Sequence, residues 1–440
     1  MKSVARAYEI ANSVRAGTVW AVDVLEGYLT QIAAREPDIR AWELIDRDGA
    51  RAAARAIDAM PLSRRGSLAG VPFGIKDVFD TAGLRTACGF PAFDQRVPAT
   101  DATVVARLRA AGAIIVGKTT TTQFANGAPT RTRNPWNAER TPGGSSSGSG
   151  AAVGAGTIPA AIGSQTGGST LRPAAYCGAV GLKPTYGRVS RFGCFGLAWS
   201  ADHVGIFAAN VADTALILEA IEGPDPLDPT TAGHTSQRGL IGSTDRPRPP
   251  SIGLLTDLFD ASTPTVRANM SEVVERLTEA GARPRRVTLP VPIADLLVVL
   301  RTIAQVEGAN LHASILRDHA ASYEPELRAS IEVGQGISAD TYLNAQRWRR
   351  IMREKLDELV GSFDVLLSPT ASNTAPNIST TGDPDFQSIW SLVGYPAISI
   401  PSGRDSDGLP FAIQLAARTF AERRLLSAAA WCERVLITAN

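Results

Sequence analysis

Lysine and histidine are scarce in this chain of 440 residues. Only five of its 44 lysine and arginine residues are lysines, and it has four histidines. No histidine stands before His203, so the usual base of a serine nucleophile is missing from the first 202 residues. Because arginine carries nearly all of the positive charge, each remaining lysine calls for a functional explanation.

Cysteine, net charge and long apolar runs are also limited. The four cysteines are widely spaced without a C-x-x-C pair, which indicates reduced cytosolic thiols and not a disulfide frame or a zinc site. The formal net charge is +1, which gives no electrostatic reason for a nucleic-acid partner. No apolar run reaches the roughly 18 residues of a membrane span, and the N-terminus lacks the apolar core of a secretory signal. We therefore expect a cytoplasmic protein with no nucleic-acid and no membrane partner.

The chain has ample material for a large core, with 44% hydrophobic and 20% charged residues. Segments with helical and strand-like patterns alternate along it, which predicts an α/β fold with a central mixed β-sheet covered by helices on both faces. We expect one domain over 1–440. Its expected parts are N-terminal helices in 1–60, a core in 61–210, a surface excursion at 223–250 and a C-terminal α/β part at 251–440 that completes the sheet.

One segment imitates a nucleotide-binding loop. Residues 112–119, GAIIVGKT, match the phosphate-loop pattern G-x-x-x-x-G-K-[ST]. That mechanism needs a loop whose N–H groups wrap phosphates, preceded by a strand. Here a predicted helix precedes the segment, and Ala-Ile-Ile-Val favours a buried strand. We therefore expect Lys118 to lie at a strand end and not in a nucleotide site.

The stretch 141–185 contains two clusters of glycine and serine, at 143–148 and 167–169, with an Ala/Gly/Val/Ile run between them. A flexible linker stays polar throughout, whereas this run can be buried. In the second cluster Ser169 follows Thr166, Gly167 and Gly168. Adjacent glycines allow a tight turn whose N–H groups point into one space, which is how an oxyanion hole is built. Ser169 is therefore a candidate nucleophile.

Lys76 is the candidate base for such a serine. It follows Phe73-Gly74-Ile75 in an apolar segment, where burial can lower its pKa until it is neutral near pH 7. The alternative is a structural ion pair with Asp77 or Asp80, although Asp77 should point to the opposite face of a strand. His203 is interpreted as a packed histidine. A proton relay between Lys76 and a distant serine needs an intervening hydroxyl, which the first cluster can supply.

Seven motifs of the chain resemble those of the amidase signature family of Ser-Ser-Lys hydrolases. The similarity extends from about residue 5 to 435 in one order. The motifs are GIKD at 74–77, PGGSS at 142–146, GSQTGGS at 163–169, RPAAYCG at 172–178, GLKPT at 181–185, DVLLSPT at 364–370 and GYPAISIP at 394–401.

The resemblance implies a role for each matching residue. Ser169 is the nucleophile, and Ser145, reached through a cis peptide after Gly144, relays its proton to Lys76. The oxyanion hole is formed by the N–H groups of Thr166, Gly167, Gly168 and Ser169. Gly144 and Arg172 contact the substrate. The reaction is hydrolysis of a C–N bond through an acyl-enzyme, with no metal and no organic cofactor. Lys183 belongs to a motif but is given a structural interpretation only.

A few residues depart from the family pattern. Gln165 replaces a frequent aspartate, Ser391 a frequent asparagine and Ser147 a frequent glycine. Gln165 and Ser147 make the chain similar to the malonamidase-like branch. There Arg172 would hold a substrate carboxylate, although an internal salt bridge explains this arginine equally well.

The sequence as a whole predicts an amidase for a small carboxamide bearing a carboxylate, such as a malonamate or a carboxylated urea or biuret. The expected partner is this small-molecule substrate, and the resemblance is compatible with a homodimer. Two alternatives remain. One is the amidase subunit of a tRNA-dependent amidotransferase, and the other is an amidase of aryl or aliphatic amides.

Overall fold

A computed structural model describes residues 6–233, 235–245 and 247–437 of the chain. Val4, an apolar position of the first predicted helix, and His234 lie outside the described residues. No helix in the described ranges is long and apolar enough to cross a membrane.

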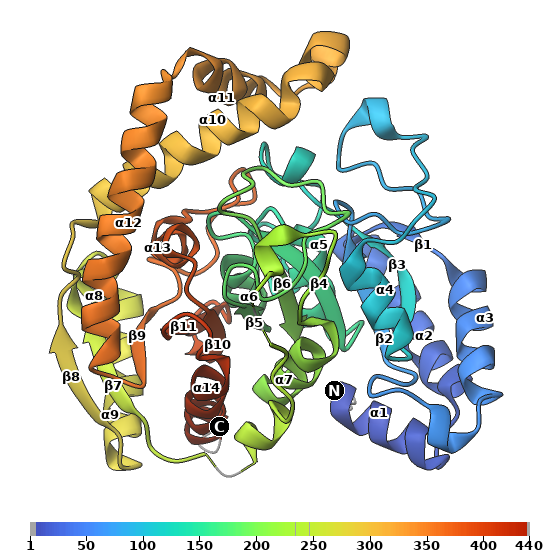
Figure 1. Cartoon of the computed structure of the whole chain (residues 1–440). Helices are drawn as coiled ribbons and strands as arrows, with labels where there is room; N and C mark the ends of the chain where they lie inside the picture. The colour runs from blue at the N-terminus through green and yellow to red at the C-terminus, as the bar shows by residue number, and fades with distance from the viewer. Residues whose placement is uncertain (1–5, 234, 246, 438–440) are drawn as a thin grey trace.

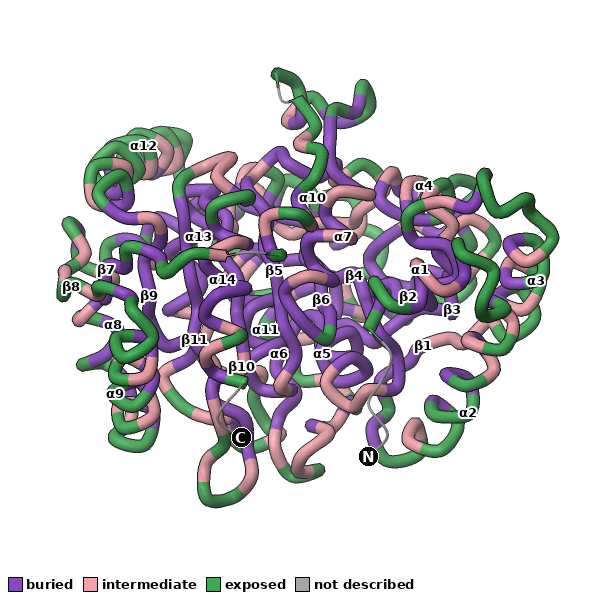
Figure 2. Tube along the Cα trace, turned by 90° about the horizontal axis from the view of Figure 1, so that it is seen from below, coloured by how far each residue is buried: buried purple, intermediate pink, exposed green. Residues whose placement is uncertain are grey.

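Eleven strands of the described chain form one mixed sheet, in the order β1-β3-β2-β4-β6-β5-β10-β11-β9-β7-β8 (Figure 1). Helices lie on both of its faces (Figure 2), which confirms the predicted fold class. The strands are β1 Trp42–Ile45, β2 Pro72–Lys76, β3 Ile114–Thr119, β4 Ala160–Gln165, β5 Val180–Lys183, β6 His203–Ala208, β7 Ser251–Leu255, β8 Arg283–Val287, β9 Val365–Pro369, β10 Ala397–Arg404 and β11 Pro410–Ala416.

The helices surround this sheet and include a separate layer, α10 to α12, that arches over one end of it (Figure 1). They are α1 Ala7–Ala16, α2 Ala21–Ile39, α3 Arg47–Asp58, α4 Thr103–Ala110, α5 Ser147–Gly154, α6 Leu171–Cys177, α7 Val211–Ile221, α8 Thr256–Asp260, α9 Pro264–Glu279, α10 Ile293–His319, α11 Pro325–Gly336, α12 Ala339–Gly361, α13 Asp385–Val393 and α14 Glu422–Ile437.

Most predicted elements are present, and those that the sequence missed have physical reasons. Strand β1 has only four residues, too few to show an alternating pattern. Helix α13 has only nine residues, too few to show a clear helical period in the sequence. The apolar segment that contains Lys76 is a strand only over β2, because turns flank it on both sides.

The stretch 141–185 is buried as predicted and includes α5, β4, α6 and β5. Its small residues let α5 approach neighbouring backbone closely. A Cβ atom on Gly148 would lie 2.1 Å from the carbonyl oxygen of Ala41, and one on Gly154 would lie 2.2 Å from that of Cys177. The glycine content therefore reflects close packing and not flexibility.

Parallel pairing of three strands brings distant segments to one edge of the sheet. β2 pairs in parallel with β3 on one side and with β4 on the other. Because the carboxyl ends of parallel strands meet at the same edge, Lys76 at the end of β2 lies beside the segments that follow β3 and β4. Those segments contain the two Gly/Ser clusters.

Candidate active site

Lys76 is fully buried at the carboxyl end of β2. Its Nζ donates hydrogen bonds to Ser145 Oγ at 2.6 Å and to Ser164 Oγ at 2.8 Å. Burial in this environment lowers the pKa of Lys76 to about 7, because the charged ammonium loses its hydration. A large fraction of this lysine is therefore neutral near pH 7 and can accept a proton.

Neither neighbouring aspartate forms the ion pair considered as the alternative for Lys76. Asp77 lies 3.7 Å from the Nζ of Lys118, and Asp80 pairs with Arg96 at 2.8 Å. Lys118 is buried in β3 and donates to the carbonyl of Phe79, so the phosphate-loop pattern is a strand, as predicted.

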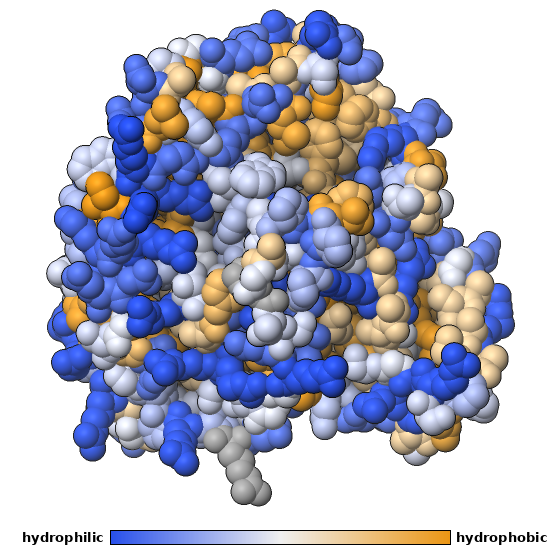
Figure 3. Space-filling view, viewed as in Figure 1, coloured by the Kyte–Doolittle hydropathy of each residue, from blue (hydrophilic) through white to orange (hydrophobic). Residues whose placement is uncertain are grey.

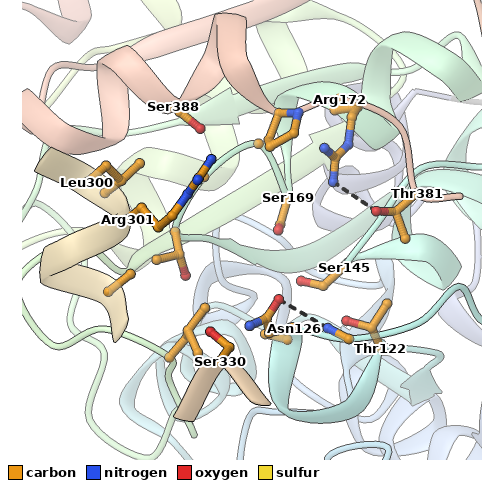
Figure 4. A pocket seen from close by; sticks show the side chains of 18 of the residues that line it. Thr122, Asn126, Ser145, Ser169, Arg172, Leu300, Arg301, Ser330, Thr381 and Ser388 are labelled. Carbon is orange, nitrogen blue, oxygen red and sulfur yellow. Dashed lines mark hydrogen bonds between the residues drawn. The ribbon is translucent and has the colours of Figure 1, made fainter. Parts of the chain in front are cut away.

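Ser145 and Ser169 lie in a cavity of about 380 Å³ at this edge of the sheet. Ser145 follows a cis peptide bond from Gly144. Ser169 lies in the loop between β4 and α6, and Figure 4 shows its side chain pointing toward Ser145. The residues proposed from the sequence for proton transfer and nucleophilic attack are thus brought together at one site, with Lys76 directly behind Ser145.

The loop 166–169 lines the same cavity. Within the described residues, the N–H groups of Gly167, Gly168 and Ser169 donate to no protein acceptor. Free N–H groups on two glycines and a serine beside a cavity can bind a developing oxyanion. The Oγ1 of Thr166 donates to Asp202 at 2.5 Å, which anchors the start of this loop.

Arg172 lines the cavity and is buried, but most of its guanidinium is already engaged. Its Nη1 donates to the carbonyl of Gly382 and its Nη2 to that of Gly144, both at 2.7 Å. Only Nε has no acceptor in the described structure. Both interpretations from the sequence expected carboxylate contacts, whereas the observed partners are carbonyls of the loops around Ser145 and Gly382.

Arg301 and Asp385 also line the cavity, and no sequence pattern pointed to either. Arg301 extends from α10 toward the cavity (Figure 4) and has no hydrogen-bond or ion-pair partner among the described residues. Burial and nearby Asp383 raise the pKa of Asp385 to about 6, against the influence of Arg301 and Arg172. The cavity thus presents one cation and one carboxylate opposite the two serines.

Ser164 is a further site residue that the sequence analysis missed, although it lies within the quoted motif 163–169. It lies near the end of β4, the strand that pairs in parallel with β2, and its Oγ accepts a hydrogen bond from the Nζ of Lys76 at 2.8 Å.

His203 and Lys183, by contrast, lie outside the cavity. Burial lowers the pKa of His203, whose Nδ1 lies 2.7 Å from the carbonyl of Ala201, and Lys183 donates to the carbonyl of Tyr395. No three His, Cys, Asp or Glu side chains within the described ranges are grouped to hold a metal ion.

The fold and the cavity define a hydrolase that acts on amide C–N bonds. Residues 23–426 match the model of the Amidase family. The chain therefore belongs to the amidase signature family, as its motifs predict.

Relatives of this chain include both amidotransferase subunits and amidases. A glutamyl-tRNA(Gln) amidotransferase subunit of Roseiflexus castenholzii is 39% identical, over 93% of this chain and 91% of its own length. A structure described as a vestigial protein complex that reveals the origins of an s-triazine catabolic enzyme covers 99% of both chains, with 33% identity and a TM-score of 0.90. The peptide amidase of Stenotrophomonas maltophilia covers 99% of this chain and 97% of its own, with 28% identity and a TM-score of 0.88.

These relatives correct the predicted partners. The Roseiflexus protein and similar ones are named as subunits of an enzyme for glutamyl-tRNA. The prediction that the only partner is a small molecule, with no nucleic acid and at most a homodimer, is therefore wrong. The net charge of one isolated chain says nothing about surfaces that other subunits supply.

The assignment to a malonamidase-like branch finds no support among these relatives either. The residues on which it rested have local roles. Ser147 donates to the carbonyl of Gly143, and Gln165 accepts the N–H of Thr170 and donates to Ser391.

Proposed function

We propose that the chain is the amidase subunit of a glutamyl-tRNA-type amidotransferase and releases ammonia from the carboxamide of an amino-acid amide such as glutamine. The observation that carries this proposal is the cavity itself. It holds Ser145 and Ser169, and also one unpaired cation and one carboxylate. The 39% identity to a subunit of such an enzyme supports the same function.

In the proposed reaction, Ser169 Oγ attacks the amide carbon while its proton passes to Ser145, whose own proton passes to the neutral Nζ of Lys76. The N–H groups of the 166–169 loop stabilise the oxyanion. The proton then returns from Lys76 through Ser145 to the leaving nitrogen, and ammonia departs. A water molecule hydrolyses the resulting ester by the same relay, which restores Ser169 and releases the acid. A lysine with a pKa near 7 suits both halves of this cycle, because it can accept and return a proton at neutral pH.

The charged groups across the cavity fit an α-amino acid head group. A guanidinium binds a carboxylate in a planar two-point contact, and a carboxylate binds an ammonium. Arg301 can supply the first contact because its guanidinium is unpaired, whereas that of Arg172 already holds two carbonyls. Asp385 can supply the second. We therefore assign recognition of the substrate carboxylate to Arg301 in preference to Arg172.

Replacing Arg301 with alanine should raise KM for glutamine about 10-fold or more, because one charge-assisted hydrogen-bond contact is lost. The kcat for glutamine and the kinetics of an uncharged amide such as butyramide should change little. Steady-state ammonia release by Arg301→Ala measures both, with Arg317→Ala as a control on the exposed side of the same helix. An equal loss on glutamine and butyramide would contradict a role in carboxylate binding.

Replacing Arg172 with alanine should lower kcat on glutamine and butyramide alike. The change removes two hydrogen bonds from a buried cation that hold the loops of Gly144 and Gly382, and we expect it to cost about 3 kcal/mol of stability. Urea unfolding and kinetics on both amides provide the test. A rise in KM for glutamine alone, at unchanged stability, would instead restore Arg172 as the carboxylate ligand.

The proposed subunit role has its own experiment. Purification of the tagged chain from its native host should recover further subunits, and glutaminase activity should depend on them. Six large apolar side chains exposed on the α10–α12 layer provide surface for such an association, and apolar side chains gather over α10 and α11 in Figure 3. They are Val298, Leu311, Val333, Leu343, Trp348 and Ile351.

A second candidate function is hydrolysis of a small acid-bearing amide, malonamate-like or biuret-like, outside any amidotransferase. It is favoured by the 33% identity to a chain of the vestigial complex described as revealing the evolutionary origins of an s-triazine catabolic enzyme. Ammonia release across glutamine, malonamate, biuret-type, aliphatic, aryl and peptide amides separates the two. Preference for glutamine, dependent on partner subunits, supports the first function, and partner-independent turnover of a malonamate or biuret supports the second.

A further inference from the structure

Two of the positions at which the sequence departs from the family pattern touch each other behind the 166–169 loop. Gln165 and Ser391 are 226 residues apart in the chain, and both side chains are fully buried. The Nε2 of Gln165 donates to Ser391 Oγ at 3.1 Å, and Ser391 Oγ donates in turn to the carbonyl oxygen of Gly167 at 2.9 Å. A continuous hydrogen-bond chain thus runs from the end of β4 through α13 to the loop.

The amide oxygen of Gln165 binds the segment that follows Ser169. Its Oε1 accepts the N–H groups of Thr170 at 2.9 Å and Leu171 at 3.0 Å, at the start of α6. Gln165 therefore holds the chain after Ser169 directly, and the chain before Ser169 through Ser391. One neutral amide uses both its donor and its acceptor to fix the two flanks of the candidate nucleophile.

The Gly167 carbonyl determines where the next N–H group points. A trans peptide is planar, with its C=O and N–H directed to opposite sides, so anchoring the oxygen of Gly167 also orients the N–H of Gly168. Gly167 and Gly168 are adjacent glycines with wide conformational freedom, so their peptide plane needs a tether. Gly168 lines the cavity and Ser391 does not, so we expect the Gly168 N–H, which is directed away from Ser391, to face the cavity.

We propose that Gln165 and Ser391 are coupled positioning residues that orient the Gly168 N–H for oxyanion binding. This inference rests on the proposed role of Ser169 as nucleophile. It requires an amide at position 165, because a carboxylate has no hydrogen to donate to Ser391. A carboxylate there would instead accept the hydroxyl hydrogen of Ser391, release the Gly167 carbonyl, and place an anion behind the site where negative charge develops.

The test compares Gln165→Glu, Ser391→Ala and the double variant. Glutamate has the length of glutamine, so Gln165→Glu changes hydrogen-bond polarity and charge at nearly constant volume. We expect each single variant to lower kcat by about 10- to 100-fold with little change in KM, as loss of aligned oxyanion donors does. Because both changes release the same carbonyl, the double variant should be no slower than the slower single variant.

A fluorophosphonate probe provides a second readout that does not depend on the amide substrate. Its reaction with Ser169 passes through a negatively charged phosphoryl centre in the same loop, so labelling rates should fall in parallel with kcat. Absence of labelling and of ammonia release in the wild-type chain would contradict the proposed nucleophile itself. Normal wild-type labelling with unchanged rates in the variants, or strictly additive losses, would overturn the positioning role alone.

Gln414→Glu is the matched control. Gln414 is a buried glutamine in β11 whose Nε2 also donates to a serine hydroxyl, that of Ser368 at 3.0 Å, but it does not line the cavity. This variant should lose stability without losing kcat. If Gln165→Glu fails to fold, the pair Gln165→Asp with Ser391→Asn restores the residues that are frequent in the family. It should regain at least 10-fold of the kcat lost by Gln165→Asp alone, and failure of this rescue in a folded protein overturns the proposal.

Discussion

Replacing Lys76 with methionine is expected to abolish ammonia release and, at the same time, to stabilise the fold. Activity should fall by about 10⁴-fold or more, because Ser145 and Ser169 lose the group that accepts their proton. Stability should rise below about pH 7, because the wild-type chain there keeps an ammonium group fully buried, with two serine hydroxyls and no carboxylate as hydrogen-bond partners. Opposite signs for activity and stability distinguish a functional lysine from a structural one.

The pH dependence of both effects follows from the lowered pKa of Lys76. The neutral amine is the active form, so kcat/KM should increase with pH through about 7, the pKa of the folded state. For stability, the group is charged in both states below pH 7, and its full burial penalty is present there. As pH rises from about 7 to 10.5, the folded state sheds its proton before the unfolded state does, and the penalty disappears.

The size of the burial penalty determines whether Lys76→Met is more or less stable than the wild-type chain near neutral pH. A shift from 10.5 to about 7 corresponds to a penalty on the order of 5 kcal/mol. The two hydrogen bonds that methionine cannot make contribute about 1 kcal/mol each. Lys76→Met should therefore be more stable by about 3 kcal/mol at about pH 6, and this advantage should vanish at about pH 9. Urea unfolding at several pH values measures the difference.

Lys183→Met provides the control for Lys76→Met. Lys183 is equally buried, and burial lowers its pKa to about 7 as well, but it donates to backbone carbonyls away from the cavity. This variant should keep its ammonia release and the pH profile of kcat/KM. Loss of activity in both variants to the same degree would mean that Lys76 acts through the fold and not through proton transfer.

The sequence predicted those parts of the site that depend on short motifs. Lys76 and the 166–169 loop could be named because a lone lysine in an apolar strand and a glycine pair before a serine are local signals, and Ser145 because the resemblance to the amidase signature family implies its role. Their meeting at one edge follows from the parallel pairing of β2 with β4, which alternating strands and helices already favour.

Residues contributed by distant elements could not be named in this way. Arg301 is one of many arginines in the chain and lies on a long helix, and only the packing of α10 over the sheet places it at the cavity. The pairing of Asp77 with Lys118, not Lys76, depends on the register between β2 and β3. Gln165 and Ser391 were recognised as departures from a pattern, but their contact across 226 residues is visible only in three dimensions.

Replacing Ser169 with alanine should remove measurable amidase activity, a loss of about 10⁴-fold or more, and leave the fold intact. The side chain makes no hydrogen bond to a described residue, so its removal leaves no polar partner unsatisfied. Circular dichroism and urea unfolding should therefore match the wild-type chain. Ser262→Ala serves as the control, since Ser262 is a buried serine that donates to the carbonyl of Leu258 far from the cavity.

The stronger form of this experiment detects the intermediate directly. With hydroxylamine present, an acyl-enzyme on Ser169 should yield a hydroxamate in place of part of the acid product, because the amine competes with water for the ester. Rapid quench and mass spectrometry should then place the acyl group on the peptide that contains Ser169. Ammonia release that survives in Ser169→Ala, or an acyl group found on Ser145, would contradict the assignment. The second result would reverse the two roles, because the serine next to Lys76 would then be the nucleophile and Ser169 a donor in its oxyanion site.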